Sequence, residues 1–153
     1  MSLEQWLQNS WLHRSESSLA EIQQLLEVVD RDLGDAQASG LSVDGRFQHA
    51  YDAALQLCMV PLRASGYRVP KSQSHHKRAI DSLRLTLGSQ WSETADHIER
   101  CSRLRGQLIY ERIGVVSEQD ADELLQVARQ LRSQILAWIR SAHPELLPPA
   151  FEE

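Results

Sequence analysis

Arg105 is the residue of this sequence whose surroundings point most directly to chemistry. A helix predicted from Ser92 to about Arg112 turns about 100° per residue, which places Arg105 in the middle of its apolar face. That face comprises Trp91, Ile98, Cys101, Leu108, Ile109 and Arg112. A guanidinium on an apolar face is costly unless an anion meets it, either a carboxylate or a phosphate. Two alternatives need no ligand: Arg105 extends past its neighbours into water, or it pairs with a core acid such as Asp52 or Asp81.

Three histidines and a second arginine extend the set of groups that can bind an anion. His75 and His76 begin a predicted helix, where free N–H groups and the positive end of the helix dipole favour a negative charge. His97 lies at the edge of the face that holds Arg105, and Arg112 lies on that same face. Together with Arg105, these are the candidate ligand-binding or phosphate-binding residues.

The other reactive side chains have structural interpretations. Asp30, Asp32 and Asp35 are expected to form a solvated helix end, and Cys58 and Cys101 to be buried free thiols. We predict no metal site, because adjacent histidines on a helix point about 100° apart and cannot readily share one metal ion. We also predict no cofactor. The sequence also contains no zinc spacing, phosphate-binding glycine loop or Gly-x-Ser-x-Gly motif.

Positive charge is concentrated in the middle of the chain, although the net charge is -5. Residues 63–112 contain ten Lys or Arg and five acids, a net charge of +5. Residues 1–62 and 113–153 have net charges of -6 and -4. Such a block can attract phosphates or an acidic protein surface. The alternative is that neighbouring acidic helices neutralise it within the bundle or across a dimer.

The elements that must position these residues are helices. Ser-x-x-Glu/Gln/Asp patterns recur just before apolar residues at helical spacing, which is typical of helix starts. We predict a short helix after Ser2 and an interruption or kink at Pro61, and the other predicted helices cover 18–38, 43–66, 75–87, 92–112 and 117–143. Short connections between long amphipathic helices indicate an all-α antiparallel bundle of about five or six helices. Residues 67–73 are expected to be a loop.

Length and composition agree with one helical domain. With 153 residues, only seven Gly and five Pro, the chain lacks the composition of all-β, collagen-like or disordered proteins. We expect a single domain over 1–143 and a frayed, Pro-rich acidic tail over 144–153. No membrane span or secretory signal is apparent, so a cytoplasmic location is expected.

One region of the sequence resembles the carboxy-terminal half of HEPN-fold proteins. The resemblance rests on Arg-Gly-Gln-Leu-Ile-Tyr-Glu at 105–111, Val-Ser-Glu-Gln-Asp-Ala at 116–121 and the amphipathic helix that follows. It also includes Leu-Arg-Ala-Ser-Gly-Tyr at 62–67 and the histidines at 75–76. In all it covers about residues 43–143, as a pattern of helix lengths and a few positions. It implies a HEPN-like helical bundle.

The resemblance also implies a function. Many members of that family are RNases, with a site formed by an Arg, a polar residue, and a His four to six residues beyond the Arg, paired across a homodimer. Arg105 matches the arginine, but Gly106 replaces the polar residue and Tyr110 stands where the histidine is needed. Because a tyrosine titrates near a pH of about 10, it is a poor general base near neutrality. The prediction is therefore a binding or interaction module with a degenerate RNase site, in which Arg105 and Tyr110 are the candidate catalytic residues.

Partners and alternatives follow from the same comparison. The resemblance implies a homodimer with the fourth and fifth helices near the two-fold axis. It also implies a role in toxin–antitoxin or phage-defence pairs, often beside a nucleotidyltransferase, with RNA or a nucleotide as a possible ligand. The first alternative is an active, metal-independent endoribonuclease that uses Arg105 and Tyr110, helped by His97 or His75. The second is a structural helical adaptor with no nucleic-acid role. No interaction with a membrane is expected.

Overall fold

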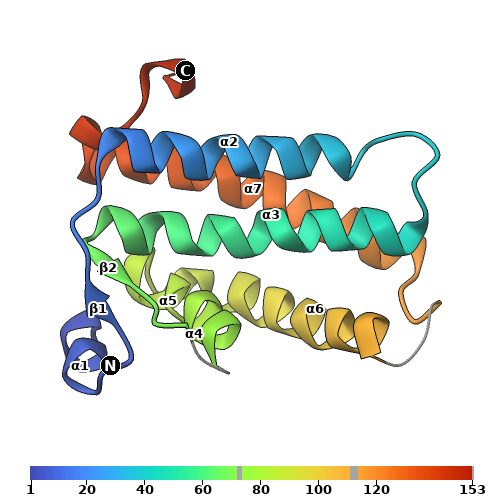
Figure 1. Cartoon of the computed structure of the whole chain (residues 1–153), viewed down its shortest axis with the longest axis horizontal. Helices are drawn as coiled ribbons and strands as arrows, with labels where there is room; N and C mark the ends of the chain where they lie inside the picture. The colour runs from blue at the N-terminus through green and yellow to red at the C-terminus, as the bar shows by residue number, and fades with distance from the viewer. Residues whose placement is uncertain (72–73, 111–113, 153) are drawn as a thin grey trace.

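Helix α3 (Val43–Ala64) runs through the centre of the molecule, and the other long helices pack around it. Helices α2 (Leu19–Asp35) and α7 (Glu118–Ala142) cover one side of α3, and α6 (Ser92–Tyr110) lies along the other side (Figure 1). α2 and α6 run in the opposite direction to α3 and α7. The fold is therefore the all-α helical bundle that the sequence predicts.

The computed structural model describes residues 1–71, 74–110 and 114–152, except for the side chains of residues 109 and 110. Its shorter elements are α1 (Leu3–Gln8), β1 (His13–Arg14), β2 (Tyr67–Arg68), α4 (His75–Asp81), α5 (Leu83–Thr86) and 3-10 turns at Ser89–Trp91, Pro144–Leu146 and Pro149–Phe151. None of the helices formed by these residues combines the length and the apolar character that a bilayer crossing requires.

Serine side chains begin the long helices, as the sequence predicts. At the start of α2, Oγ of Ser18 accepts a hydrogen bond from the backbone N–H of Glu21 at 3.2 Å. At the start of α7, Ser117 and Asp120 form a reciprocal pair, in which each side chain accepts a hydrogen bond from the backbone N–H of the other. Each such contact satisfies a backbone donor at a helix end and stabilises the helix by about 1 kcal/mol.

Small side chains on α3 let the neighbouring helices approach closely. Ala50, Ala53 and Ala54 are fully buried, and so are the larger Phe47 and Tyr51. Alternation of small and large side chains allows helices to interlock at a short distance. This packing fixes α3 in the bundle, so that side chains on its partly exposed edge lie at defined positions.

The helix predicted over 75–87 is interrupted at Ser82. Helix α4 ends at Asp81 and α5 begins at Leu83, with Ser82 fully buried between them. The Ser82 hydroxyl donates to the carbonyl of Ala79 at 2.7 Å. The prediction of one continuous helix was wrong because a buried serine can hydrogen-bond to its own backbone, which competes with regular helix geometry.

The ends of two other helices differ from the prediction. Helix α2 ends at Asp35 rather than at Ala38, because its apolar face stops at the buried Ala36. The backbone N–H of Ala38 then donates to the carbonyl of Asp35 at 3.1 Å, which closes a tighter turn. Helix α3 continues past Pro61 to Ala64, so the proline does not end it. Pro61 lies in the last turn and is buried, and there it removes only one of the final hydrogen bonds.

The predicted loop over 67–73 includes a short strand. Strand β2 pairs with β1 in antiparallel fashion, with His13 opposite Arg68 and Arg14 opposite Tyr67. Strands of two residues are too short to show the alternation by which a strand is recognised in a sequence. The pair joins the N-terminal segment to the connection between α3 and α4.

The C-terminal tail packs against the bundle, so the expectation of a frayed tail was wrong. Two 3-10 turns bring Leu147 and Phe151 to the core, where they are 7% and 8% exposed. The guanidinium carbon of Arg132 lies 5.7 Å from the centroid of the Phe151 ring. Prolines exclude an α-helix here but allow compact turns, and the two apolar side chains then gain burial.

Candidate functional site

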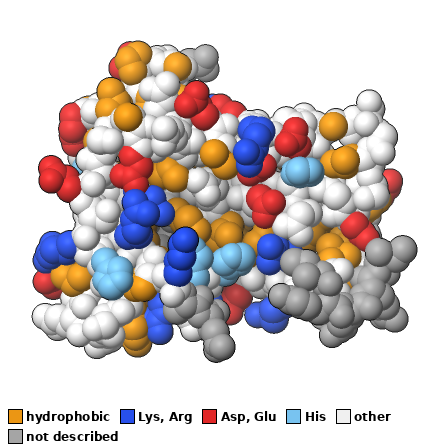
Figure 2. All heavy atoms as spheres, viewed as in Figure 1, with side chains coloured by type: hydrophobic (Ala, Val, Ile, Leu, Met, Phe, Trp, Pro, Cys, Tyr) orange, Lys and Arg blue, Asp and Glu red, His pale blue; other side chains and the backbone are white. Residues whose placement is uncertain are grey.

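Helices α3, α4 and α6 bring together a group of polar side chains that we call the Arg105 cluster: Tyr51, His75, His76, Ser102 and Arg105. Tyr51 lies in the middle of α3, His75 and His76 are the first residues of α4, and the other two are one turn apart on α6. Figure 2 shows histidine side chains beside basic side chains in the middle of this face of the molecule. The cluster thus joins residues that are far apart in the sequence.

The fully buried ring of Tyr51 is the centre of the cluster. Its hydroxyl lies 3.1 Å from Nδ1 of His76, and the side chain of Ser102 is close enough to lower the pKa of this hydroxyl. The guanidinium carbon of Arg105 lies 5.4 Å from the centroid of the Tyr51 ring, within the range of a cation–π contact. The rings of His75 and His76 have their centroids 5.8 Å apart. Burial raises the pKa of Tyr51, so its hydroxyl stays protonated and can donate near neutral pH.

Arg105 has a buried donor without an acceptor. Its Nε is buried and makes no hydrogen bond, and no ion pair joins Arg105 to any acid in the described part of the chain. Of the two acids considered as partners, Asp81 pairs with Lys77 and Arg84, and Asp52 accepts a hydrogen bond from Gln48 at 3.0 Å. The charge of Arg105 still acts on Asp52. Burial raises the pKa of the Asp52 carboxyl group, whereas the hydrogen bond from Gln48 and the charge of Arg105 lower it. Arg105 is thus half-buried without a direct anionic partner among these residues.

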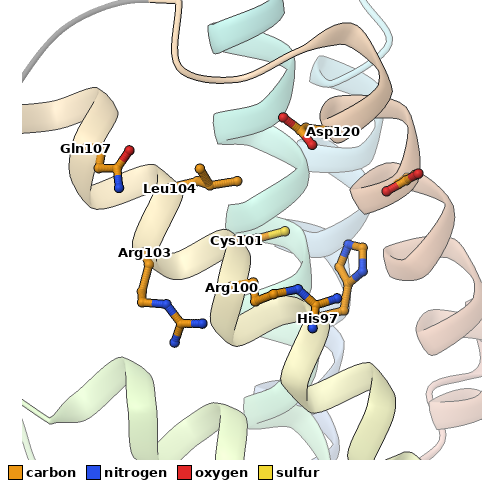
Figure 3. Close-up of a pocket in the computed structure, with 8 residues that line it drawn as sticks. His97, Arg100, Cys101, Arg103, Leu104, Gln107 and Asp120 are labelled. Carbon is orange, nitrogen blue, oxygen red and sulfur yellow. The ribbon is translucent and has the colours of Figure 1, made fainter.

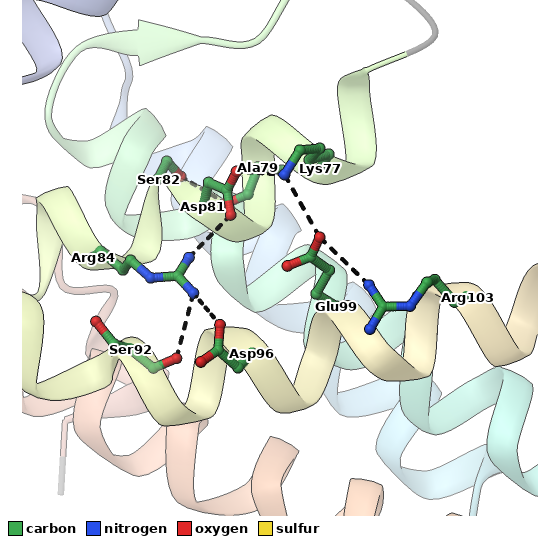
Figure 4. Close-up of polar contacts among 9 residues, drawn as sticks. All are labelled: Lys77, Ala79, Asp81, Ser82, Arg84, Ser92, Asp96, Glu99 and Arg103. Atoms are coloured by element: carbon green, nitrogen blue, oxygen red, sulfur yellow. Dashed lines mark hydrogen bonds and ion pairs between the residues drawn. The ribbon is translucent and has the colours of Figure 1, made fainter. Parts of the chain in front are cut away.

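Other basic residues of the positive block are neutralised within the bundle. The pairs are Arg63–Glu21, Arg68–Glu21, Lys77–Asp81, Arg84–Asp81 and Arg103–Glu99, with N–O distances from 2.9 to 3.6 Å. Figure 4 shows that Arg84 also reaches Asp96 and that Lys77 and Arg103 meet at Glu99. For these residues, the alternative interpretation given above therefore holds: acids within the bundle neutralise the positive charge. Arg105 differs from them because none of the acids that the structure describes pairs with it.

His97 lies away from the Arg105 cluster, in a groove between α6 and α7. The groove has a cavity of about 420 Å³ that is also lined by Arg100, Cys101 and Asp120, which Figure 3 shows with His97. Burial lowers the pKa of His97, and the charge of Arg100 lowers it further. Burial raises the pKa of the Cys101 thiol to about 12, so it is not a reactive thiolate. The structure therefore does not bring His97 to Arg105.

Two further predicted site residues lie outside the part of the chain that the structure describes: the side chain of Tyr110 and the whole of Arg112. Of the predicted set, the structure brings together Arg105, His75 and His76.

Tyr51 and Ser102 are members of the cluster that the sequence analysis missed. Tyr51 lies on the apolar face of α3, and its ring is buried. A buried tyrosine hydroxyl needs a hydrogen-bond partner, which is the signal that could have identified it. Its partner His76 is 25 residues away in the sequence, so only the packing of α4 on α3 shows the pair.

Asp32 is buried, which corrects the expectation of a solvated helix end. It is 4% exposed, accepts a hydrogen bond from Arg31 at 3.2 Å and lies 4.0 Å from Nδ1 of His49. The ligand atoms of Asp32, Asp35 and His49 all lie within 4.8 Å of one another, the spacing of a group that could hold a metal ion. Arg31 already supplies a positive charge to this group, so the contacts are those of an internal ion pair.

Comparisons with protein-family models, with curated proteins and with solved structures give no match for this chain.

Proposed function

We propose that this protein is a HEPN-like helical module that binds RNA by holding a phosphate group at the Arg105 cluster. The main support is the state of Arg105: its Nε is buried and unpaired, while Arg84 and Arg103 are bound to acids. An unsatisfied buried donor costs about 1–3 kcal/mol, which a ligand oxygen would remove. A phosphate offers both the acceptor and the negative charge that a guanidinium binds well.

The surroundings of Arg105 favour binding over cleavage. The ring of Tyr51 supports the guanidinium from one side and restricts its position. A positioned arginine can contact a phosphate or stack on a base, and both contacts are common in the recognition of single-stranded RNA. The position where the resemblance requires a catalytic histidine is occupied by Tyr110. We therefore propose a binding protein rather than an enzyme.

One observation favours the endoribonuclease as a second candidate. Burial and the charge of Arg105 lower the pKa of His76, so this imidazole is neutral near pH 7 and able to accept a proton. A histidine beside an arginine could serve in place of the one missing from the sequence motif. The binding experiment below includes a test of cleavage for this reason.

The wider role that we propose rests on the resemblance alone. It comprises a homodimer with α4, α5 and α6 near the two-fold axis, in a cytoplasmic toxin–antitoxin or phage-defence pair with a nucleotidyltransferase partner. Sedimentation of the pure protein tests the first element: a dimer should have twice the mass of the 17.4 kDa chain. A monomer at all concentrations would contradict it.

RNA affinity of the wild type and two arginine variants tests the proposed function. Fluorescence anisotropy would measure the binding of a labelled single-stranded RNA at low salt and at increasing salt. We expect Arg105→Ala to weaken binding about 10- to 100-fold, as for the loss of a charge-assisted contact. Arg103→Ala is the matched control, because it removes the same charge from an exposed position on the same helix. This variant should change the affinity by no more than about twofold.

Three outcomes separate the candidate functions. Loss of affinity in Arg105→Ala alone supports the binding module. Cleavage of the RNA by the wild type, lost in Arg105→Ala and in His76→Gln, would establish the endoribonuclease instead. If no RNA binds even at low ionic strength, where phosphate contacts are strongest, the structural adaptor is the remaining candidate function.

A further inference from the structure

The Arg105 cluster contains two buried polar atoms that make no hydrogen bond within the protein. Besides Nε of Arg105, Nδ1 of His75 is buried and makes no hydrogen bond. The two histidine rings lie side by side, and His76 is close enough to Arg105 for that charge to lower its pKa. Buried polar atoms in native proteins nearly all have partners, so two orphans in one cluster indicate that a ligand with several acceptor oxygens completes it.

His76 is the group in this cluster whose charge can change on binding. It faces Tyr51 and Asp52 from α3, His75 from its own helix and Arg105 from α6. Burial lowers its pKa most, Arg105 and His75 lower it further, and Asp52 partly opposes them. A neutral ring with its hydrogen on Nε2 accepts the Tyr51 hydroxyl at Nδ1, which leaves Nε2–H for a ligand.

No acid among the described residues forms an ion pair with Arg105, so this part of the chain leaves the cluster short of negative charge. Asp52 acts on the cluster through its charge, and burial raises the pKa of this carboxyl group. The positive charge of Arg105 is therefore compensated by Asp52 only at a distance, without an ion pair. A ligand with two negative charges would compensate both Arg105 and a protonated His76, whereas a ligand with one charge would compensate Arg105 alone.

We infer that the cluster binds a phosphate monoester, such as the terminal phosphate of an RNA, in preference to an internal phosphodiester, and that His76 takes up a proton as the ligand binds. This inference rests on the proposed function and specifies its ligand. A monoester has a second pKa of about 6, so it is largely a dianion at neutral pH and presents three acceptor oxygens. A phosphodiester has one charge and two free oxygens. In the complex that we infer, Arg105 Nε–H, His76 Nε2–H and His75, in its Nδ1–H tautomer, would each donate to one oxygen of the monoester.

Oligonucleotides that differ only at their ends test the preference. The probes are one RNA sequence with a 5′-phosphate, with a 3′-phosphate and with hydroxyls at both ends, together with a nucleoside 5′-monophosphate. We expect at least one phosphorylated RNA to bind about tenfold more tightly than the unphosphorylated RNA at pH 7, the effect of about 1.4 kcal/mol. Equal affinities for all three RNAs would overturn the inference and leave the proposed function intact. Failure of every RNA to bind would overturn the proposed function as well.

Calorimetry tests the proton uptake. Titration of the protein with the tighter RNA in two buffers of different ionisation enthalpy should show a proton bound by the complex. This uptake should disappear in His76→Gln, while Tyr67→Phe, outside the cluster, should retain it. Uptake that is unchanged in His76→Gln, or absent from the wild type, would contradict the role of His76. If the nucleoside monophosphate binds as tightly as the RNA, the monoester preference holds and the RNA is not the partner, which would overturn the proposed function alone.

Discussion

The Tyr51 hydroxyl lies 3.1 Å from Nδ1 of His76, and this contact ties the middle of α3 to the first turn of α4. Tyr51 is packed on all sides, because its ring is fully buried in the core. His76 is held at one ring nitrogen and keeps the other for a ligand. Tyr51, in the central helix α3, thereby sets the position of the His76 side chain at the surface of the bundle.

Tyr51→Phe should weaken the attachment of α4 with little effect on the core. The ring stays, so apolar burial is retained, but Nδ1 of His76 loses its partner. We expect the free energy of unfolding to fall by about 1 kcal/mol, the usual effect of one lost hydrogen bond. Urea unfolding measures it. A loss above about 3 kcal/mol would mean that the ring itself had moved, against this interpretation.

Lowering the pH should destabilise the protein through its half-buried histidines. Burial lowers the pKa of His76 and of His97 below the ordinary value near 6.5. Between the lowered pKa and 6.5 the unfolded chain binds more protons than the folded one, so the stability rises with pH and is lost as the pH falls through this window. The urea midpoint should therefore decrease from pH 7 to pH 5.

Replacement of one histidine isolates its share of this pH dependence. His76→Gln should lose less stability than the wild type between pH 7 and pH 5, since the unfavourable protonation of that ring is gone. Carboxyl groups are common to both proteins, so their contribution cancels in the comparison. An identical pH dependence in the variant would show that His76 is not the group responsible.

Gly106→Ala should stabilise helix α6. A Cβ at this position would contact nothing within 4 Å, so the added methyl group causes no clash. Alanine in a helix is more stable than glycine by about 0.5–1 kcal/mol. Gly88→Ala is the contrasting control, because Gly88 has a φ of 106°, a backbone conformation that is strained for alanine. Thermal unfolding should show a higher midpoint for the first variant and a lower one for the second.

Glu21 should contribute more to stability than other acids in ion pairs at the surface. Its carboxylate accepts hydrogen bonds from Arg63 and Arg68, both at 2.9 Å, and the Arg63 side chain is only 15% exposed. Glu21→Gln should cost about 1–3 kcal/mol, because it leaves a half-buried guanidinium without its counter-charge. Glu4→Gln removes an exposed pair with Arg14 and should cost less than about 1 kcal/mol. Equal effects in urea unfolding would contradict this ranking.

The helices of this fold could be predicted from the sequence, but their contacts could not. Serine caps and apolar spacing predicted the starts of α2 and α7, and apolar spacing predicted the start of α3, because those signals lie within a few residues of each other. The break at Ser82 and the strand pair were missed because they depend on burial and on residues far along the chain. For the same reason, the sequence predicted only part of the Arg105 cluster. An arginine on an apolar face can be recognised in the sequence, whereas its contact with Tyr51 on another helix cannot.

Phe151→Ala should destabilise the whole bundle, although the residue is the third from the end of the chain. Phe151 is only 8% exposed and is part of the core. Loss of a buried phenylalanine side chain costs about 3–5 kcal/mol, and the lower end applies at the edge of a core. Glu152→Ala, at an exposed position next to it, should change the stability by less than about 0.5 kcal/mol. An unchanged unfolding midpoint in Phe151→Ala would mean that the tail does not pack in solution.

The pairing of β1 with β2 has a consequence for the order in which the chain folds. His13 and Arg68 are partners, so the pairing closes a loop of roughly 50 residues that contains all of α2 and α3. Closing so long a loop costs more chain entropy than a two-residue strand pair returns, unless the helices inside it have already docked. We therefore expect the strand pair to form late in folding. It forms after α2 and α3 have docked and does not nucleate their docking.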